Sequence, residues 1–162
     1  MKGIDVSYYI VKTHILAILN AMQLNLTNLN KTIIALDRAL ATANLYSETN
    51  NSNRDLQETL RAGVIQNFEI SYEQCWKMIQ RWISLNVSKE DATYPRTRKE
   101  LFRLAAKYGL IDDPKPWFQY GDARNLTSHT YDEDTADEVY AVAHNFLLSA
   151  KNLFNKLEKL NA

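Results

Sequence analysis

The sequence predicts an all-α fold, an up-and-down bundle of four or five helices. Only four glycines and three prolines occur among 162 residues, which leaves few signals for the many turns of a β protein. Apolar residues recur at alternating steps of three and four along most of the chain, as they do on the buried face of a helix. No segment alternates apolar and polar residues as a strand does, so packed helices are the simplest architecture.

The composition bounds the class of protein. A hydrophobic content of 46% in 162 residues is enough for one domain with a buried core. Nineteen basic and nineteen acidic residues give a net charge of zero, which argues against a sequence-independent coat on nucleic acid. The single cysteine, Cys75, excludes an internal disulfide framework and fits a reducing cytosol. His14, His129 and His144 lack partner ligands at fixed spacing, so we expect neither a metal nor another cofactor.

The N-terminal segment predicts a first helix over residues 6–23. It is apolar from Ile10 to Leu26, but Lys12 and other polar side chains interrupt it. This composition fits neither a membrane span nor a secretory leader. We therefore expect a cytoplasmic protein that does not associate with a membrane.

The apolar stripe of this segment continues without a clear stop. Either one helix runs from about Ser7 to Asn44, or the helix breaks near Asn25 to Asn28, where Thr27 offers a cap. A stripe of this length forms either bundle core or the seam of a dimer. Its members are Ile15, Leu19, Met22, Leu26, Leu29, Ile33, Leu36 and Leu40.

A polar loop over Ser47–Asn53 precedes the next predicted helix, which runs to about Leu85. Ser52 or Asn53 offers the cap. Gly63 is costly inside a helix and suggests a close contact with another helix. The predicted buried face contains Leu56, Leu60, Val64, Phe68, Tyr72, Cys75, Ile79 and Trp82.

Glu69, Glu73 and Lys77 form one polar ridge on this helix, spaced four residues apart. They are either a surface ladder of side-chain pairs or a source of a carboxylate near Arg124 or His129. The residues alone favour the ladder.

A short basic helix is predicted to follow. Thr97 and Glu100 have the spacing of a capping box, and Gly109 is suited to end the helix in the left-handed conformation. Five cations against Glu100 alone lie between Arg96 and Lys107. This basic segment is either a solvated face or a guide for a nucleic acid or an acidic partner.

Two more helices complete the prediction. Asp113 followed by Pro114 has the pattern of a cap and a first-turn proline, and Gly121 suggests that this helix is short or irregular. Asp132 to Thr135 has the character of the next helix start, and Thr135 and Glu138 offer a further capping box. The last helix buries Val139, Val142, Phe146, Leu147, Leu153, Phe154 and Leu157.

Residues 124–131 concentrate side chains suited to RNA cleavage. Arg124 offers a permanent cation with a fork of donors for a phosphate, and His129 can exchange protons near neutral pH. On an unbroken helix these two residues are separated by about 140°. They can face one ligand only if the helix ends between them or a second copy of the chain contributes. Thr127, Ser128 and Thr130 are poor helix formers, which favours a break.

Two segments together resemble a known family. Residues 62–77 are similar to the second-helix signature of the nucleotidyltransferase substrate-binding proteins, a helical family of the HEPN superfamily. Arg124 to Tyr131 resembles that family's Arg-x4-His-x-Tyr motif. The residues around Phe102, Gly109 to Asp113 and Trp117 also fit. The likeness covers roughly Leu24 to Leu160, so we expect a HEPN-like helical domain over 24–162 and an N-terminal helical extension over 1–23.

The resemblance implies a homodimer whose two Arg-x4-His motifs face one cleft. Many members resemble metal-independent endoribonuclease toxins that are paired with a minimal nucleotidyltransferase antitoxin. By that resemblance Arg124 holds the scissile phosphate, His129 is the general acid or base, and Asn125 positions substrate or the dyad. Glu69, Glu73 and Ser128 have supporting roles, and the partner can attach AMP to Tyr131.

Three functions follow as hypotheses. The first is the ribonuclease toxin, for which RNA is the substrate. The second is a non-catalytic subunit that binds a substrate or nucleotide for a separate nucleotidyltransferase. The third is a plain helical dimerisation module, in which Arg124 and His129 affect only stability.

Overall fold

The computed structural model describes residues 23–48, 53–87, 97–129 and 132–161. The predicted helix over 6–23 therefore lies outside the described residues. The described ranges contain the α-helices α2 (Thr27–Glu48), α3 (Arg54–Asn86), α4 (Arg98–Lys107), α5 (Pro114–Leu126) and α6 (Glu133–Leu160), with a 3-10 turn, η1 (Thr127–His129), between the last two. No strand occurs in these ranges, so the prediction of an all-α bundle is confirmed.

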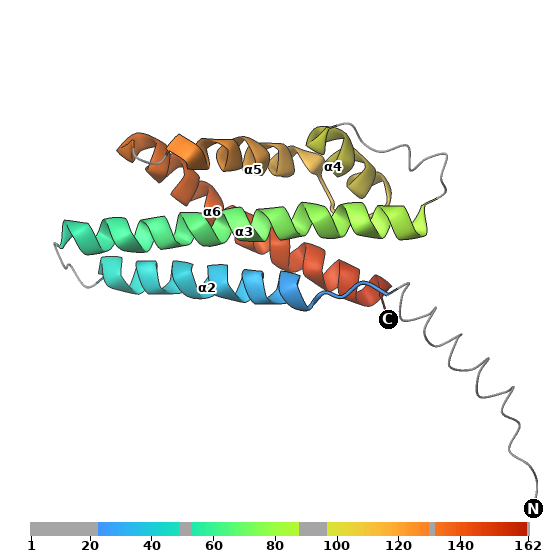
Figure 1. The fold of residues 1–162 in the computed structure, drawn as a ribbon, viewed down its shortest axis with the longest axis horizontal. Coiled ribbons are helices and arrows are strands. Elements are labelled where there is room, and N and C mark those ends of the chain that lie inside the picture. The colour runs from blue at the N-terminus through green and yellow to red at the C-terminus, as the bar shows by residue number, and fades with distance from the viewer. Residues whose placement is uncertain (1–22, 49–52, 88–96, 130–131, 162) are drawn as a thin grey trace, which may run out of the picture.

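The helices α2, α3, α5 and α6 form the bundle and alternate in direction along its long axis (Figure 1). α3 is the central helix, because α2, α5 and α6 all pack against it. The short α4 lies beside the C-terminal part of α3, next to the start of α5 (Figure 1). At one end the side chain of Asn161 binds both the N–H and the carbonyl of Leu24, which joins the start of the described chain to the end of α6.

The start of α2 decides between one long helix and a break. Residues 24–26 are not helical, so the break occurs where the second alternative placed it. Thr27 is the first helical residue rather than the cap, because the Asn25 Oδ1 accepts the Thr27 N–H at 3.0 Å. Ser47 lies inside α2, so the predicted loop begins later than expected.

The predicted α3 is confirmed, with Asn53 as its cap: the Asn53 side chain accepts the Leu56 N–H at 3.1 Å. Leu56 itself is exposed, contrary to the predicted buried face. The first turn of α3 makes ion pairs, such as Arg54 with Glu133 on α6, instead of core contacts. The predicted close contact at Gly63 is wrong, since a Cβ there would meet no atom within 4 Å.

The two ends of α4 match the predicted signals. Thr97 and Glu100 form the reciprocal capping box. Gly109 has φ +74°, and the Leu110 N–H donates to the Ala105 carbonyl at 2.9 Å, which closes the helix as a Schellman motif. Both ends of α4 are therefore specified locally, and this positions its first residue, Arg98.

The remaining caps are partly as predicted. Asp113 accepts the Lys115 N–H at the start of α5, with Pro114 in the first turn. α5 continues through Gly121 without interruption. α6 begins at Glu133, capped by Asp132, so the capping box predicted at Thr135 is not used: the Thr135 N–H and hydroxyl both bind Asp132 instead.

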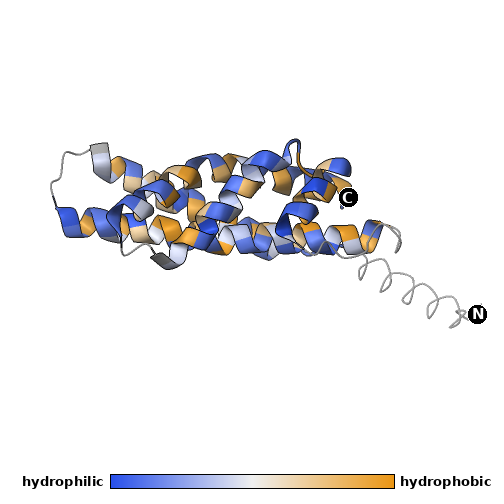
Figure 2. Cartoon of the chain, turned by 90° about the horizontal axis from the view of Figure 1, so that it is seen from above, coloured by the Kyte–Doolittle hydropathy of each residue, from blue (hydrophilic) through white to orange (hydrophobic). Residues whose placement is uncertain are grey.

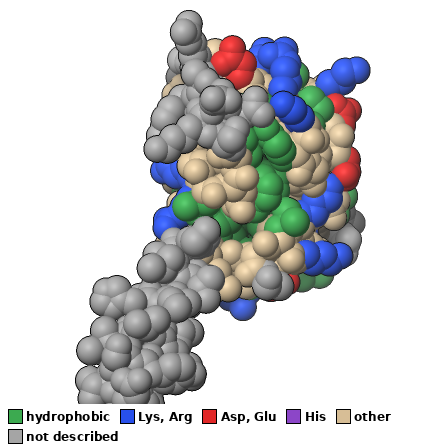
Figure 3. Space-filling view, turned by 90° about the vertical axis from the view of Figure 1, so that its right-hand side faces the viewer, with side chains coloured by type: hydrophobic (Ala, Val, Ile, Leu, Met, Phe, Trp, Pro, Cys, Tyr) green, Lys and Arg blue, Asp and Glu red, His purple; other side chains and the backbone are tan. Residues whose placement is uncertain are grey.

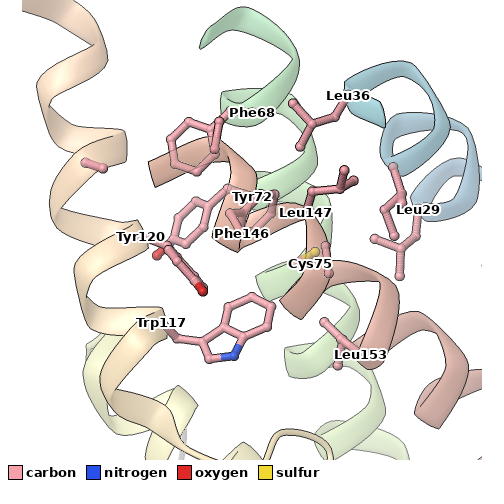
Figure 4. Close-up of a cluster of buried hydrophobic side chains, with 14 of the residues drawn as sticks. Leu29, Leu36, Phe68, Tyr72, Cys75, Trp117, Tyr120, Phe146, Leu147 and Leu153 are labelled. Carbon is pink, nitrogen blue, oxygen red and sulfur yellow. The ribbon is translucent and has the colours of Figure 1, made fainter. Parts of the chain in front are cut away.

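The core is built from the inward faces of all five α-helices, and apolar and polar residues alternate around each helix (Figure 2). Aromatic rings from α3, α5 and α6 meet at its centre (Figure 4). Phe146 packs edge-on against Phe68 and Tyr120, with ring centroids 5.1 and 5.4 Å apart. Trp117 extends this cluster toward Phe102 on α4. This packing holds α5 firmly against α3, on which the site described below depends.

Over the residues described, no helix combines the length and apolar character that crossing a bilayer requires.

Candidate functional site

The helix that carries Arg124 ends between Arg124 and His129. α5 stops at Leu126, and Thr127–His129 form the 3-10 turn η1. The Thr127 hydroxyl donates to the Arg124 carbonyl at 2.7 Å, and the Ser128 hydroxyl donates to the Asn125 carbonyl at 3.3 Å. The hydroxyls thus add hydrogen bonds to carbonyls at the end of the helix, where the Arg124 carbonyl also accepts the Thr127 N–H. The predicted break is present, and short polar side chains produce it.

Two carboxylates of α3 hold the Arg124 guanidinium. Its Nε donates to Glu73 Oε1 at 3.0 Å, and its Nη2 lies 3.0 Å from Glu69 Oε1. Glu69 and Glu73 are one helical turn apart, so both carboxylates face α5. The polar ridge is therefore not a plain surface ladder: two of its three members pair with Arg124, whereas Lys77 lies over the ring of Trp76.

Glu73 is the most heavily bonded group of the site. Its Oε1 accepts from both Arg124 and Arg98 at 3.0 Å, and its Oε2 accepts from the Trp76 indole N–H at 2.8 Å. Burial raises the pKa of this carboxyl, but the Trp76 hydrogen bond and the two guanidiniums outweigh that effect and leave the pKa below its usual range. Glu73 is therefore ionised at neutral pH and unsuited to act as a general acid there.

Arg98, the first residue of α4, belongs to this cluster, although the sequence singled it out only as part of a basic segment. Its guanidinium lies 4.9 Å from the Trp76 ring centroid and 5.4 Å from that of Tyr72. Cation–π contacts and the ion pair with Glu73 together hold it. No spacing along the chain links residue 98 to residue 73, so only the packing of α4 on α3 reveals the pair.

The cluster Glu69–Glu73–Arg98–Arg124 carries two negative and two positive charges. Arg124 is nevertheless 31% exposed, and its ion pairs with Glu69 and Glu73 engage Nη2 and Nε. A guanidinium has five N–H donors in a rigid fork. The carboxylates thus fix the orientation of Arg124, and its partly exposed fork has further donors of the kind that bind an anion such as a phosphate.

Asn125 and Ser128 lie apart from this ion cluster. Asn125 is exposed and lines a pocket between α4 and α5, and the Ser128 hydroxyl is turned to the Asn125 carbonyl rather than to Arg124. The side chain of His129 and all of Tyr131 lie outside the described residues. The backbone of His129 ends η1, directly after the helix break.

Within the described residues, no group of three or more His, Cys, Asp or Glu side chains is arranged to hold a metal ion. Cys75 is buried in the core, and burial raises the pKa of its thiol. It is therefore a packing residue rather than a nucleophile.

A sequence model of the family described as "Nucleotidyltransferase substrate binding protein like" matches residues 24–159. This chain belongs to that family. A curated relative, "Probable ribonuclease HepT" of Haemophilus influenzae, is 40% identical over 106 residues, which are 65% of this chain and 73% of the relative.

Two solved structures share the fold. One, from Haemophilus influenzae, was described as revealing the fold of a substrate binding domain of a nucleotidyltransferase. It is 34% identical with a TM-score of 0.77, and the match covers 83% of this chain and 99% of that one. A crystal structure from Thermus thermophilus is 23% identical with a TM-score of 0.55, covering 75% and 98% of the two chains, and supports the fold alone.

In this member of the nucleotidyltransferase substrate-binding family, the basic helix α4 lies at one end of the bundle. Figure 3 shows that end, with Lys and Arg side chains in its upper part and along its edges, around exposed apolar groups. Arg98, Lys99, Arg103 and Lys107 are the cations of α4. The site therefore combines an orientated arginine with a neighbouring cationic helix.

Proposed function

We propose that this protein is a metal-independent endoribonuclease of the HEPN toxin type, which uses Arg124 and His129. The observation that carries the proposal is the Arg124 guanidinium. Glu69 and Glu73 hold it in one orientation, it remains partly exposed, and the helix ends directly after it. The 40% identity to a protein named as a probable ribonuclease supports the same activity.

The proposed reaction is a transesterification within the RNA strand. The 2′-hydroxyl loses its proton and attacks the adjacent phosphorus, while the bond from phosphorus to the 5′-oxygen breaks and that oxygen takes up a proton. His129 supplies or accepts one of these protons, and Arg124 stabilises the charge that develops on the phosphoryl oxygens. DNA lacks the 2′-hydroxyl and is not a substrate.

Other residues have supporting roles in this proposal. Glu69 and Glu73 keep Arg124 from adopting other rotamers, so its fork is orientated before substrate binds. Asn125 contacts substrate from the exposed end of α5. The Ser128 hydroxyl closes the last turn of α5 and so maintains the helix break that separates Arg124 from His129.

Assembly and control belong to the same proposal. Two copies of the chain form a homodimer in which both motifs face one cleft. The partner is a minimal nucleotidyltransferase that acts as antitoxin and attaches AMP to Tyr131. An AMP group adds negative charge and bulk beside the phosphate site, which opposes the binding of RNA.

The test is cleavage of RNA by purified protein in the presence of a chelator. We expect products with a cyclic phosphate and a 5′-hydroxyl from the unmodified protein, a loss of at least a hundredfold for His129→Ala and Arg124→Ala, and no cleavage of a DNA strand of the same sequence. His144→Ala is the matched control and should cleave normally, because the His144 ring packs against Tyr140, whose hydroxyl binds Asn44 of α2. Cleavage that survives His129→Ala would refute the mechanism.

A second function rests on a different observation. The Haemophilus influenzae neighbour is described as a substrate binding domain of a nucleotidyltransferase, and the ion cluster of Arg124 is charge-balanced. A non-catalytic subunit would co-purify with a nucleotidyltransferase, would cleave no RNA, and would lose nucleotide binding on Arg124→Ala. The same set of purified variants separates the two functions.

A further inference from the structure

We infer that the pocket between α4 and α5 is a nucleotide-binding subsite, which takes one nucleoside with its phosphate directed toward the start of α4. The pocket has a volume of about 300 Å³. Its aromatic walls are Phe102, Trp117 and Phe118, and its polar groups come from Tyr72, Thr97, Arg98, Lys99, Asp122 and Asn125. This volume is at the lower end of the usual range for ligand pockets, roughly 300–1,000 Å³, and fits a single nucleotide.

The inner end of the pocket contains a buried hydroxyl, that of Tyr72, which the Arg98 guanidinium approaches. Tyr72 is 0% exposed, and its hydroxyl forms no hydrogen bond of standard geometry within the described part of the chain. Burial raises the pKa of this hydroxyl, although the Arg98 guanidinium opposes the effect. Tyr72 is therefore protonated at neutral pH.

Gly121 makes room for that hydroxyl. A Cβ at position 121 would lie 2.8 Å from the Tyr72 hydroxyl oxygen, so any larger residue would push against it. Figure 4 shows Tyr72 reaching from α3 toward α5. The helix thus carries a glycine, at a cost in helix propensity, at the place where the Tyr72 hydroxyl approaches α5.

The outer end of the pocket is cationic. Arg98 and Lys99 open α4, and the Lys99 ammonium lies 5.8 Å from the Phe118 ring centroid. Asp122 is the one acid among the described lining residues, so a phosphate is favoured on the α4 side and repelled from the α5 side. Phe118 is the partly exposed ring of the three, whereas Phe102 and Trp117 are 1% and 3% exposed. A base therefore stacks on the free part of Phe118 and can donate its N–H groups to Asp122 or Asn125.

The pocket is also coupled to the proposed catalytic group. Arg98 lines the pocket and shares Glu73 Oε1 with Arg124. Asn125 lines the pocket and follows Arg124 directly in sequence. A nucleotide in the pocket would therefore lie beside Arg124. That this nucleotide is the one next to the cleaved phosphate of RNA rests on the proposed function. That the pocket binds a nucleotide does not.

The test measures binding to the whole purified chain by calorimetry or by NMR titration at one fixed salt concentration. The probes are cytidine and adenosine 5′-monophosphates, ribose 5-phosphate and inorganic phosphate. We expect the nucleotides to bind at least tenfold more tightly than ribose 5-phosphate, because the base occupies the aromatic part of the pocket. Equal affinities for nucleotide and ribose 5-phosphate would overturn the inference.

The variants assign the binding to this pocket. Gly121→Ala, which narrows the pocket, should weaken nucleotide binding at least tenfold. Lys99→Ala should weaken the binding of the nucleotides and of ribose 5-phosphate by similar factors. Because Lys99 is exposed, this variant is expected to fold. Lys159→Ala, an exposed lysine on α6, is the matched control and should bind as the unmodified protein does. Unchanged binding by Lys99→Ala would place the ligand elsewhere and refute the inference.

Cleavage assays then separate this inference from the proposed function. If RNA is cleaved but Lys99→Ala and Tyr72→Phe leave both kcat and KM unchanged, the ribonuclease assignment stands and the pocket is not a subsite. If the nucleotides bind and the variants weaken that binding, but no RNA is cleaved, the pocket is established as a nucleotide site and the ribonuclease assignment fails. We expect Lys99→Ala to raise KM about tenfold with little change in kcat.

Discussion

Arg98 and Arg124 donate to the same carboxylate oxygen, Oε1 of Glu73, each at 3.0 Å. One side chain of the central helix thereby aligns the first residue of α4 with the last turn of α5. Two guanidiniums near one point repel each other, so the arrangement depends on the charge of Glu73 and on its neighbour Glu69. The positions of the candidate catalytic arginine and of the pocket cation are consequently not independent.

Glu73→Gln should weaken both the fold and the proposed activity. The substitution removes a charge and places an amide N–H₂ among three donors, so we expect a loss of about 1–3 kcal/mol in the free energy of unfolding. Arg124 would lose its orientation, and RNA cleavage should fall at least tenfold, mainly in kcat. Urea unfolding and single-turnover cleavage measure the two effects. The control is Glu138→Gln, at an exposed glutamate on α6, which should change neither the free energy of unfolding nor the rate of cleavage. An equal loss in this control would contradict the role of Glu73.

The stability contributed by Glu73 should depend on pH in a defined direction. Its pKa is lowered, since Trp76, Arg98 and Arg124 outweigh the opposing effect of burial. A carboxyl with a lowered folded-state pKa contributes its full stability above its unfolded pKa, about 4.3. That contribution is lost as the pH falls from the unfolded-state pKa through the lower pKa of the folded state. The difference between the unmodified protein and Glu73→Gln should therefore be constant from about pH 6 to 8 and should shrink below about pH 4. Parallel stability curves down to pH 3 would refute this.

Tyr72 and Gly121 should be coupled in a double-mutant cycle. Gly121→Ala alone should destabilise the protein by about 1–3 kcal/mol, because its Cβ would lie 2.8 Å from the Tyr72 hydroxyl. Tyr72→Phe removes a buried hydroxyl that makes no hydrogen bond of standard geometry within the described residues and should cost little. In the Tyr72→Phe background, Gly121→Ala should be neutral or stabilising, since alanine favours the helix. Chemical denaturation of the four proteins measures the coupling, and simple additivity would contradict it.

Gly63 and Gly109 should respond in opposite directions to alanine. Gly63 lies within α3 with open space around its missing Cβ, so Gly63→Ala should stabilise the protein by about 0.5–1 kcal/mol. Gly109 has φ +74°, which alanine adopts only with strain, so Gly109→Ala should cost about 1–2 kcal/mol. Thermal unfolding of both variants provides the measurement. Stabilisation by Gly109→Ala would show that α4 can end without the left-handed residue.

Much of the fold was predictable because the signals are local. The cap at Asn53, the capping box at Thr97, the left-handed Gly109 and the start at Asp113 each depend on residues a few positions apart, and each is present. One error occurred where two local signals compete. At the start of α6 both Asp132 and Thr135 can cap, and Asp132 does so because its carboxylate accepts from both the N–H and the hydroxyl of Thr135.

For the candidate site, the sequence by itself determined the chemical groups and the helix break between Arg124 and His129. Those features depend on residue type and on hydroxyls bonded within one turn. Only the tertiary structure decided that Glu69 and Glu73 face Arg124, that Arg98 joins them, and that the Tyr72 hydroxyl lies opposite Gly121. These contacts join residues on three different helices, and their geometry follows from how α4 and α5 pack on α3. Helical periodicity tells which face of each helix is buried but not which residues of two faces meet.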